Sequence, residues 1–363
     1  VSGCLLKINH GVLSQKWLMQ DNRISVIIPA YQAGNTIDRA LRSVASQTLK
    51  PGEIVVVDDG SDDDTASVAE ALRPIFENVK LTIIRQANAG AGAARNRAIA
   101  ECTGIILAFL DADDEWLPEK LKRSIFELDL GCYSLVAHNS WIVDGSIKTQ
   151  NDCALRFRAS GDPYENLYRR GYIDTSTVIV KRDLVIQSGG FNESLLNAQD
   201  FELWLAVLQN PSEKFLVFED FLSRYFISSG SIMSFTERRR ECAFDIAIRY
   251  APVLQRRGSR WFSALLFRVL VIHFESINAA FADKIAGTHF ENYVLTFSEN
   301  EYSIQLRDGG TPDPLLEHAN ESLKKEVLLQ ERTREDNNNR INKGGVESKL
   351  NPQRTQVLKV LTR

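Results

Sequence analysis

The stretch Ile105-Ile106-Leu107-Ala108-Phe109-Leu110-Asp111-Ala112-Asp113 decides the fold. Its first six residues are continuously apolar and too few to span a membrane, which predicts a short buried strand. Asp111 and Asp113 follow this strand, and side chains at i and i+2 of an extended chain point to the same side. Two converging carboxylates suit a hard divalent cation whose other ligands are phosphate oxygens. Alternatively, they end the strand and cap the helix that Pro118 helps to begin.

Apolar strands and amphipathic helices alternate through the first third of the chain. The predicted strands are 24–28, 54–57, 81–84 and 105–110. Near-continuous apolar strands that alternate with helices predict a mostly parallel sheet covered on both faces. In such sheets ligands bind beyond the carboxyl ends of the strands. The loops at residues 29–31, 58–59 and 111–113 are therefore expected to open on one crevice.

The composition is that of an ordinary globular protein, with 44% hydrophobic and 25% charged residues. A formal net charge of −4 gives no indication of a nucleic-acid partner. The five cysteines are scattered and form no CxxC pair, as expected of reduced thiols in a cytosolic protein. We find no apolar run of about 18 residues that could span a membrane and no convincing signal peptide.

The alternation weakens after Leu128, where only short strands are predicted, among them 134–137 and 141–143. Residues 200–208 form a helical pattern with Asp200 in its opening turn. The pattern is helical from 237 to about 300, and the sequence beyond Tyr302 is polar. The predicted organisation is an N-terminal extension (1–22), an α/β domain (23–232, with halves 23–130 and 131–232), a helical extension (233–301) and a polar, weakly ordered tail (302–363).

Two nucleotide-binding signatures can be tested directly. The segment Gly90-Ala91-Gly92-Ala93-Ala94-Arg95 fails as a dinucleotide fingerprint, because Arg95 stands where Gly or Ala is required and residues 86–89 separate it from the preceding strand. A Walker phosphate loop is absent, since the sequence contains no Gly-Lys-Ser/Thr.

Asp59, at the end of the second strand, has two open interpretations. It can cap the helix that follows, or it can accept a hydrogen bond from a nucleotide. A carboxylate suits an imide N–H such as that of uracil, and Tyr31 would offer a stacking surface for the base.

Four segments, in this order, resemble the motifs of the family 2 inverting glycosyltransferases with the GT-A fold. They are residues 27–32, 56–65, 88–96 and 110–114. Residues 175–177, 189–191 and 199–204 resemble acceptor-side segments of the same family, so the resemblance covers about 24–231. It implies a GT-A-like, Rossmann-like α/β fold with a mostly parallel sheet flanked by helices, here followed by a C-terminal helical extension.

The resemblance also implies an activity. It is the inverting transfer of a single sugar, of hexosyl type, from a nucleotide-sugar donor, usually a UDP-sugar, to a hydroxyl on a glycan or lipid-linked glycan. Asp113, helped by Asp111, would ligate Mg²⁺ or Mn²⁺, which stabilises the diphosphate leaving group. Asp200 would be the general base. The implied donor-binding residues are Pro29, Ala30, Tyr31, Asp59, Asp111 and Ala112, and the implied acceptor-binding residues are Thr175, Ser176 and Trp204. Arg95 has two open interpretations: it meets the diphosphate of the donor, or it holds its own loop in place.

Departures from the family pattern keep alternatives open. The family commonly has Glu-Asp where this chain has Gln199-Asp200, which allows a degenerate nucleotide-sugar-binding module. A sugar nucleotidyltransferase is a second alternative, although residues 29–35 lack its Gly-rich basic loop. The Gln-x-x-Arg-Trp segment and membrane helices of processive synthases are missing, which favours a single addition. For Trp204, a place in the core is the alternative to an acceptor contact. We expect a cytoplasmic location, with peripheral association at the inner face of the membrane left open.

Overall fold

The computed structural model describes residues 20–157, 161–170, 173–227, 236–259, 261–278, 293–298 and 301–306. The chain divides into two compact units, residues 1–268 and 269–363. Nearly all of the predicted N-terminal extension and most of the predicted tail lie outside the described residues. The domain boundaries proposed from the sequence therefore remain predictions.

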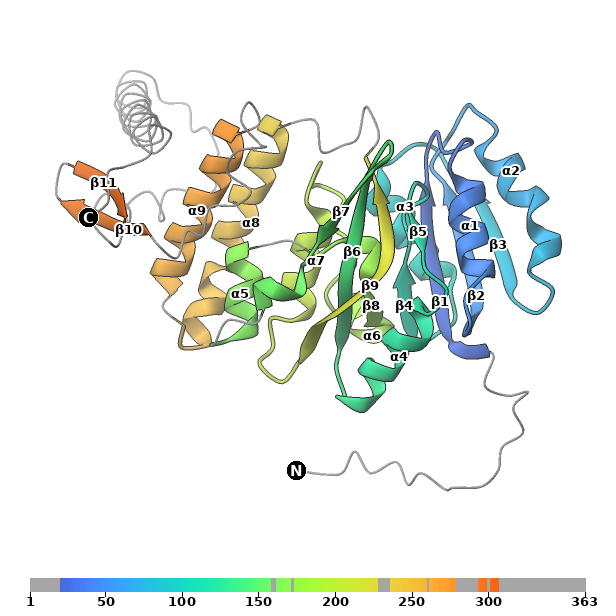
Figure 1. The fold of residues 1–363 in the computed structure, drawn as a ribbon, viewed down its shortest axis with the longest axis horizontal. Helices are drawn as coiled ribbons and strands as arrows, with labels where there is room; N and C mark the ends of the chain where they lie inside the picture. Colours follow the sequence, from blue (N-terminus) through green and yellow to red (C-terminus); the bar gives the residue numbers. More distant parts are fainter. Residues whose placement is uncertain are drawn as a thin grey trace, which may run out of the picture. The chain divides into compact units, whose positions relative to one another are not determined.

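A single sheet organises the first unit (Figure 1). Its strands are β1 Gln20–Ala30, β2 Lys50–Asp58, β3 Lys80–Arg85, β4 Ile106–Phe109, β5 Glu115–Trp116, β6 Leu135–Asp144, β7 Ile147–Asn151, β8 Ile179–Lys181 and β9 Phe215–Phe226. Their order is β3-β2-β1-β4-β8-β6-β9-β5, and β7 pairs with β6. Strands β3, β2, β1 and β4 are mutually parallel, as are β6 and β9, whereas β8 runs antiparallel to both its neighbours and β5 runs antiparallel to β9. The predicted α/β fold with a mostly parallel sheet is confirmed.

Helices lie between and after these strands in the sequence. They are α1 Ile37–Ala45, α2 Thr65–Ala71, α3 Ala91–Glu101, α4 Lys120–Leu130, α5 Pro163–Arg170, α6 Arg182–Gln187, α7 Gln199–Val207, α8 Thr236–Arg256 and α9 Trp261–Asn278, with 3-10 turns η2 Arg73–Ile75, η3 Ala154–Phe157 and η4 Thr175–Thr177. Helices α8 and α9 confirm the predicted C-terminal helical extension. Within the described residues, no helix combines the length and the apolar composition needed to cross a bilayer.

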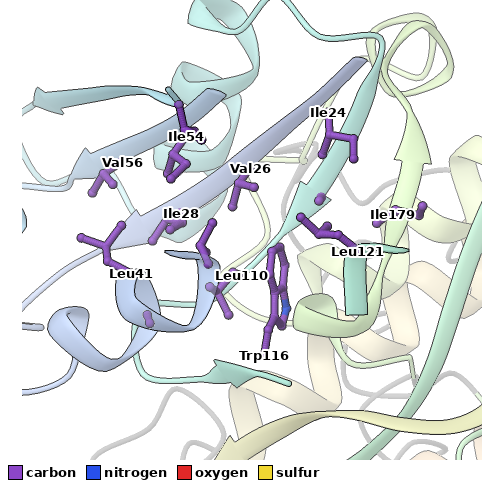
Figure 2. Packing of buried hydrophobic residues seen from close by; sticks show 14 of the residues in the cluster. Ile24, Val26, Ile28, Leu41, Ile54, Val56, Leu110, Trp116, Leu121 and Ile179 are labelled. Atoms are coloured by element: carbon purple, nitrogen blue, oxygen red, sulfur yellow. The ribbon is translucent and has the colours of Figure 1, made fainter. Parts of the chain in front are cut away.

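The main core lies on one face of β1, β2 and β4 (Figure 2). Ile24, Val26 and Ile28 of β1 are fully buried and share this core with Leu41 of α1 and Leu121 of α4. Helix α3 packs against β1 and β2 and belongs to the other face, since it contributes nothing to this core. Burial on both faces explains why residues 24–28 of β1 are apolar except for Ser25 and do not alternate with polar residues.

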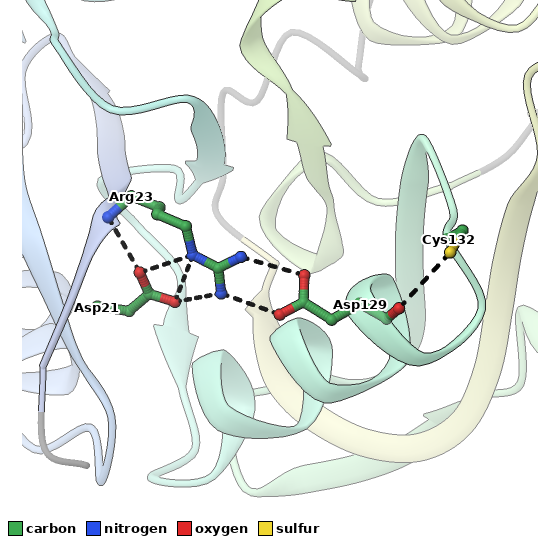
Figure 3. Close-up of polar contacts among 4 residues, drawn as sticks. All are labelled: Asp21, Arg23, Asp129 and Cys132. Atoms are coloured by element: carbon green, nitrogen blue, oxygen red, sulfur yellow. Dashed lines mark hydrogen bonds and ion pairs between the residues drawn. The ribbon is translucent and has the colours of Figure 1, made fainter. Parts of the chain in front are cut away.

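Arg23 connects the start of β1 to the end of α4 (Figure 3). Its guanidinium forms ion pairs with Asp21 (2.7 Å) and Asp129 (2.9 Å). Exposed pairs of this kind contribute at most about 1 kcal/mol, whereas fully burying one isoleucine contributes about 1.5–3 kcal/mol. The apolar core therefore fixes the position of β1, and Arg23 adds a smaller restraint at its start.

Several predicted elements differ from the observed ones. Residues 134–137 and 141–143, predicted as separate strands, lie on the single strand β6, except for Ser134, which precedes it. Its central residues His138, Asn139 and Ser140 are polar yet buried, and this interrupts the apolar signal. The helical prediction for 237–300 is wrong at Tyr293–Ser298, which forms β10 of an antiparallel hairpin with β11, Glu301–Leu306.

Lys120 is a buried lysine at the start of α4. It is 0% exposed, and its Nζ has no hydrogen-bond partner among the described residues and lies 4.0 Å from the ring centroid of Trp116. Burial lowers the pKa of Lys120 well below its ordinary value. Burial and the nearby Lys120 charge lower the pKa of His138 to about 3. An amine buried in this way costs stability.

We predict that Lys120→Met raises the free energy of unfolding by about 1–3 kcal/mol at pH 7, because it removes an unsatisfied buried amine. The folded chain binds fewer protons than the unfolded chain between the depressed pKa of Lys120 and about 10.4. Wild-type stability should therefore rise with pH in this window, and the variant should lose that rise.

Urea unfolding at pH 7 and pH 9 measures both effects. The control is Lys122→Met, which changes an exposed lysine of the same helix and should shift stability by no more than about 0.5 kcal/mol. Equal stability of Lys120→Met and wild type at both pH values would show that the amine is not buried as described.

Candidate active site

The ends of three neighbouring strands meet at one edge of the sheet. Ala30 of β1 pairs with Asp58 of β2, and Ile27 pairs with Phe109 of β4, all in parallel register. Asp59 extends the first pairing by donating its backbone N–H to Ala30 O (2.8 Å). The loops after β1, β2 and β4 therefore open on the same edge, as the sequence predicted.

The residues predicted to lie beside a nucleotide base occupy the end of β1. Pro29 and Ala30 are buried, whereas Tyr31 is 54% exposed. A large exposed aromatic ring at a strand end is available for stacking. The two buried residues offer mainly their backbone to a ligand at this edge.

Asp59 connects the end of β2 to the loop before α3. Its carboxylate accepts hydrogen bonds from the backbone N–H groups of Ala89 (2.9 Å) and Gly90 (2.7 Å) and from the side chain of Gln86 (2.8 Å). Asp63, and not Asp59, accepts a hydrogen bond from the first backbone N–H of α2 (3.0 Å), so the capping interpretation of Asp59 is wrong. A carboxylate has about four acceptor positions, and three are occupied here.

The acidic loop, residues 111–114 after β4, carries three carboxylates. Asp111 accepts a hydrogen bond from Arg95 (2.5 Å). Burial raises the pKa of Asp113 to about 6, and the charge of Asp111 adds to this effect, while Arg39 and Arg95 partly offset it. Asp114 is buried, and burial together with the charges of Asp111 and Asp113 holds its pKa well above the ordinary value. Ala112, between the carboxylates, is also buried.

Arg95 brings a positive charge to this loop from α3. Only 7% of it is exposed, and its guanidinium lies 5.2 Å from the ring centroid of Phe191. Phe191 is held through its backbone, whose N–H and carbonyl both bind the side chain of Asn96 at 2.8 Å. The adjacent residues Arg95 and Asn96 thus connect α3 to the acidic loop and to the turn at Gly189-Gly190-Phe191.

Asp200 faces the same group of charges from the first turn of α7, where the sequence predicted it. Its carboxylate accepts hydrogen bonds from Thr175 Oγ1 (2.8 Å) and from the backbone N–H of Phe201 (2.7 Å). Burial raises the pKa of Asp200. The Thr175 hydrogen bond, the charge of Arg95 and the Phe201 N–H lower it, and the charge of Asp111 raises it again. The side chain can therefore exchange a proton without a direct ion pair.

Turn η4 holds two of these carboxylates at once. Thr175 donates to Asp200, and the adjacent Ser176 donates to Asp114. Ser176 Oγ also accepts the backbone N–H of Asp111 (3.1 Å), and its carbonyl accepts the indole N–H of Trp116 (2.7 Å). Thr175 and Ser176 were predicted to bind acceptor, but they are only 6% and 3% exposed and their hydroxyls already bind carboxylates.

Trp204 lies in the core and not on an open surface. It is 0% exposed, and its ring packs at 5.8 Å from Phe109 and 6.4 Å from Phe191, measured between centroids. The structure agrees with the alternative interpretation, in which Trp204 belongs to the core, because α7 is buried along nearly its whole length. In this structure Trp204 packs against Phe191 and has no exposed face for an acceptor.

Gln199 has a structural role that a glutamate could not fill. Its side-chain N–H group donates to the backbone carbonyls of Leu195 (2.7 Å) and Asn192 (3.3 Å). A carboxylate at this position would have no donor for these carbonyls. The departure from the family pattern therefore leaves Asp200 and its contacts intact.

Arg39 is a site residue that the sequence analysis missed. It reaches from α1 to donate to the backbone carbonyl of Asp113, and its guanidinium lies 3.6 Å from the ring centroid of Phe226 in β9. It also lowers the pKa of Asp113. The sequence carries no signal for this role, because a single arginine in an amphipathic helix is normally a solvated residue.

The carboxylates of the acidic loop can be assessed as ligands for a divalent cation. Within the described ranges, no group of three or more His, Cys, Asp or Glu residues could hold a metal by itself. A cation that takes its other ligands from a diphosphate needs only one or two carboxylates. One oxygen of Asp111 is bound to Arg95, so Asp113 is the better placed carboxylate, and the hard oxygen donors fit Mg²⁺ or Mn²⁺.

Comparison with known proteins identifies the family. Residues 25–184 match the model of Glycosyl transferase family 2. The UDP-Glc:alpha-D-GlcNAc-diphosphoundecaprenol beta-1,3-glucosyltransferase WfgD of Escherichia coli is 30% identical over 226 residues, which are 61% of this chain and 85% of that protein. An uncharacterized glycosyltransferase of Nostoc sp. is 42% identical over 127 residues, 35% of this chain, and the match spans only 39% of that protein.

A solved structure supports the fold. Staphylococcus aureus TarS 1–349 in complex with UDP-GlcNAc matches with a TM-score of 0.53 and 20% sequence identity, over 79% of this chain and 98% of that chain. The predicted GT-A fold is confirmed. On the sequence match, its coverage and this fold, the chain belongs to glycosyl transferase family 2.

Proposed function

We propose that this chain transfers one sugar from a UDP-sugar to a hydroxyl group of a glycan or lipid-linked glycan, with inversion at the anomeric carbon and with Asp200 as general base. As a family 2 glycosyltransferase it acts on a nucleotide-sugar donor. The observation that carries the finer proposal is the placement of Asp200, which lies in the same group of charges as Asp111 and Arg95 and is held by neutral donors.

The donor would lie along the edge formed by the ends of β1, β2 and β4. The exposed ring of Tyr31 would stack on the base, and the remaining acceptor position of Asp59 would bind the uracil imide. Arg95 would face the diphosphate from α3. The solved complex of TarS with UDP-GlcNAc shows that a protein of this fold binds such a donor.

Asp113, with Asp111 beside it, would hold Mg²⁺ or Mn²⁺. GT-A family glycosyltransferases generally use divalent metals, and a bound cation stabilises the charge that develops on a departing diphosphate. The raised pKa of Asp113, about 6, is consistent with a carboxylate whose counter-charge is supplied by a ligand.

The acceptor hydroxyl must lose its proton as it attacks the anomeric carbon. Asp200 would take this proton from the face opposite the leaving group, so that one displacement inverts the centre. A lipid-linked glycan is a suitable acceptor class, since the Escherichia coli relative is named for an undecaprenol-linked acceptor. Such an acceptor would bring the enzyme to a membrane surface.

We predict that Asp200→Asn lowers the rate of sugar transfer by about 10²–10⁴-fold, the usual contribution of a general base. The amide can still accept the Thr175 hydrogen bond but cannot take a proton. Binding of UDP-sugar, measured by calorimetry with Mn²⁺, should stay unchanged. Asp183→Asn, which changes an exposed residue of α6, is the matched control; near-normal turnover of Asp200→Asn would show that another group is the base.

A second prediction concerns Asp113→Ala. Loss of this ligand should remove the increase in UDP affinity that Mn²⁺ gives, an effect of about tenfold to hundredfold for a charge-assisted contact. Calorimetric titrations of UDP with and without Mn²⁺ measure it. The control is Asp38→Ala, which removes a carboxylate from α1 that is paired with Arg42. If Mn²⁺ still enhances UDP binding to Asp113→Ala, the metal site lies elsewhere.

A further inference from the structure

The side-chain hydroxyls of Thr175 and Ser176 in turn η4 contact two different parts of the proposed active site. Thr175 binds the carboxylate of Asp200, which lies 25 residues away in sequence. Ser176 binds Asp114, 62 residues away in the acidic loop, and also accepts the backbone N–H of Asp111. Consecutive residues of a single turn therefore contact the proposed base and the proposed donor-binding loop.

We propose that Thr175 and Ser176 are positioning residues with separate tasks: Thr175 orients the carboxylate of Asp200 toward the acceptor hydroxyl, and Ser176 holds the acidic loop in the geometry that binds the donor diphosphate. Because both residues belong to turn η4, this turn fixes the distance between the base and the sugar donor. This inference rests on the proposed function, which assigns Asp200 and the acidic loop their roles.

The turn has the rigidity that this task requires. Its backbone is closed by a hydrogen bond from Thr177 N to Asp174 O (2.9 Å) and another from Val178 N to Thr175 O (3.1 Å). The Asp174 side chain accepts hydrogen bonds from Ser140 of β6 and from Asn151 of β7 (2.9 Å). These contacts anchor η4 to two strands of the sheet, so a shift of the turn would break buried hydrogen bonds and leave their polar groups unsatisfied.

The hydroxyl of Thr175 is also chemically suited to orienting a base. A hydroxyl binds one oxygen of a carboxylate and leaves its negative charge in place. The other groups that face Asp200 are the Phe201 N–H of its own helix, Arg95 of α3 and Asp111 after β4. All three remain when Thr175 is changed, so the effect of its hydroxyl can be measured by itself.

For Thr175→Val we expect kcat for sugar transfer to fall about tenfold to hundredfold, because a hydrogen bond to a charged group is lost. KM for the UDP-sugar should change by less than about twofold, since the acidic loop keeps its hydrogen bonds with Ser176. The acidic limb of the kcat profile should move to higher pH, because the lost hydrogen bond had lowered the pKa of Asp200. Thr175→Ser should restore both rate and profile.

For Ser176→Ala we expect the opposite pattern. The affinity for UDP in the presence of Mn²⁺ should fall about tenfold, while kcat at saturating donor and the acidic limb stay at their wild-type values. The control for both variants is Thr177→Val, an equally buried change in the same turn whose hydroxyl donates to the backbone carbonyl of Asp174 (2.7 Å) and to no carboxylate. It should lower stability without moving kcat, KM or the pH profile.

The same variants separate failure of this inference from failure of the proposed function. The ¹³C carboxyl signal of Asp200, identified by its loss in Asp200→Asn, should titrate at higher pH in Thr175→Val than in wild type and Thr177→Val. This readout needs no turnover, so an inactive wild type would reject the proposed function and leave the positioning of Asp200 testable. Unchanged titration and kinetics in Thr175→Val, or the same changes in Thr177→Val, would overturn the inference.

Discussion

The site depends on the ion pair between the buried guanidinium of Arg95 and the carboxylate of Asp111. Strand ends and a helix start bring Asp111, Asp113 and Asp200 into one charged region, where burial and like charge raise the pKa of Asp113 and Asp200. Arg95 binds Asp111 at 2.5 Å and lowers the pKa of the other two carboxylates from a greater distance. Because this cation belongs to the chain itself, the carboxylates are partly compensated before any metal or substrate binds.

Most of the architecture of the half that we propose binds the donor followed from the sequence, because its signals are local. Strand β4, residues 24–28 of β1 apart from Ser25, and residues 54–57 of β2 are apolar, and residues at the strand ends are placed by the parallel register alone. The convergence of Tyr31, Asp59 and Asp111 at one edge could therefore be predicted without any tertiary information. What the sequence could not show is that Asp59 already accepts three hydrogen bonds from the loop before α3.

The half of the domain that we propose binds the acceptor was harder to predict, because polar residues are buried there. His138, Asn139 and Ser140 interrupt the apolar run of β6, and the sequence divided one strand into two. Thr175 and Ser176 carry the right chemistry for acceptor binding, but their partners lie 25 and 62 residues away and are visible only in the fold. Roles of this kind depend on which side chain the tertiary structure places opposite a hydroxyl, and periodicity carries no such information.

Asp111 and Asp200 differ in their partners: Asp111 is paired with a cation, and Asp200 is bound by uncharged hydrogen-bond donors. A direct ion pair with arginine would hold a carboxylate in its charged form but would also weaken it as a proton acceptor. Arg95 makes its close contact with Asp111, while Asp200 receives its hydrogen bonds from a hydroxyl and a backbone N–H. Burial pulls the pKa of Asp200 upward against these neutral donors. The carboxylate that needs no proton is thus paired with the cation, and the one proposed to accept a proton is kept basic by burial and oriented by an uncharged neighbour.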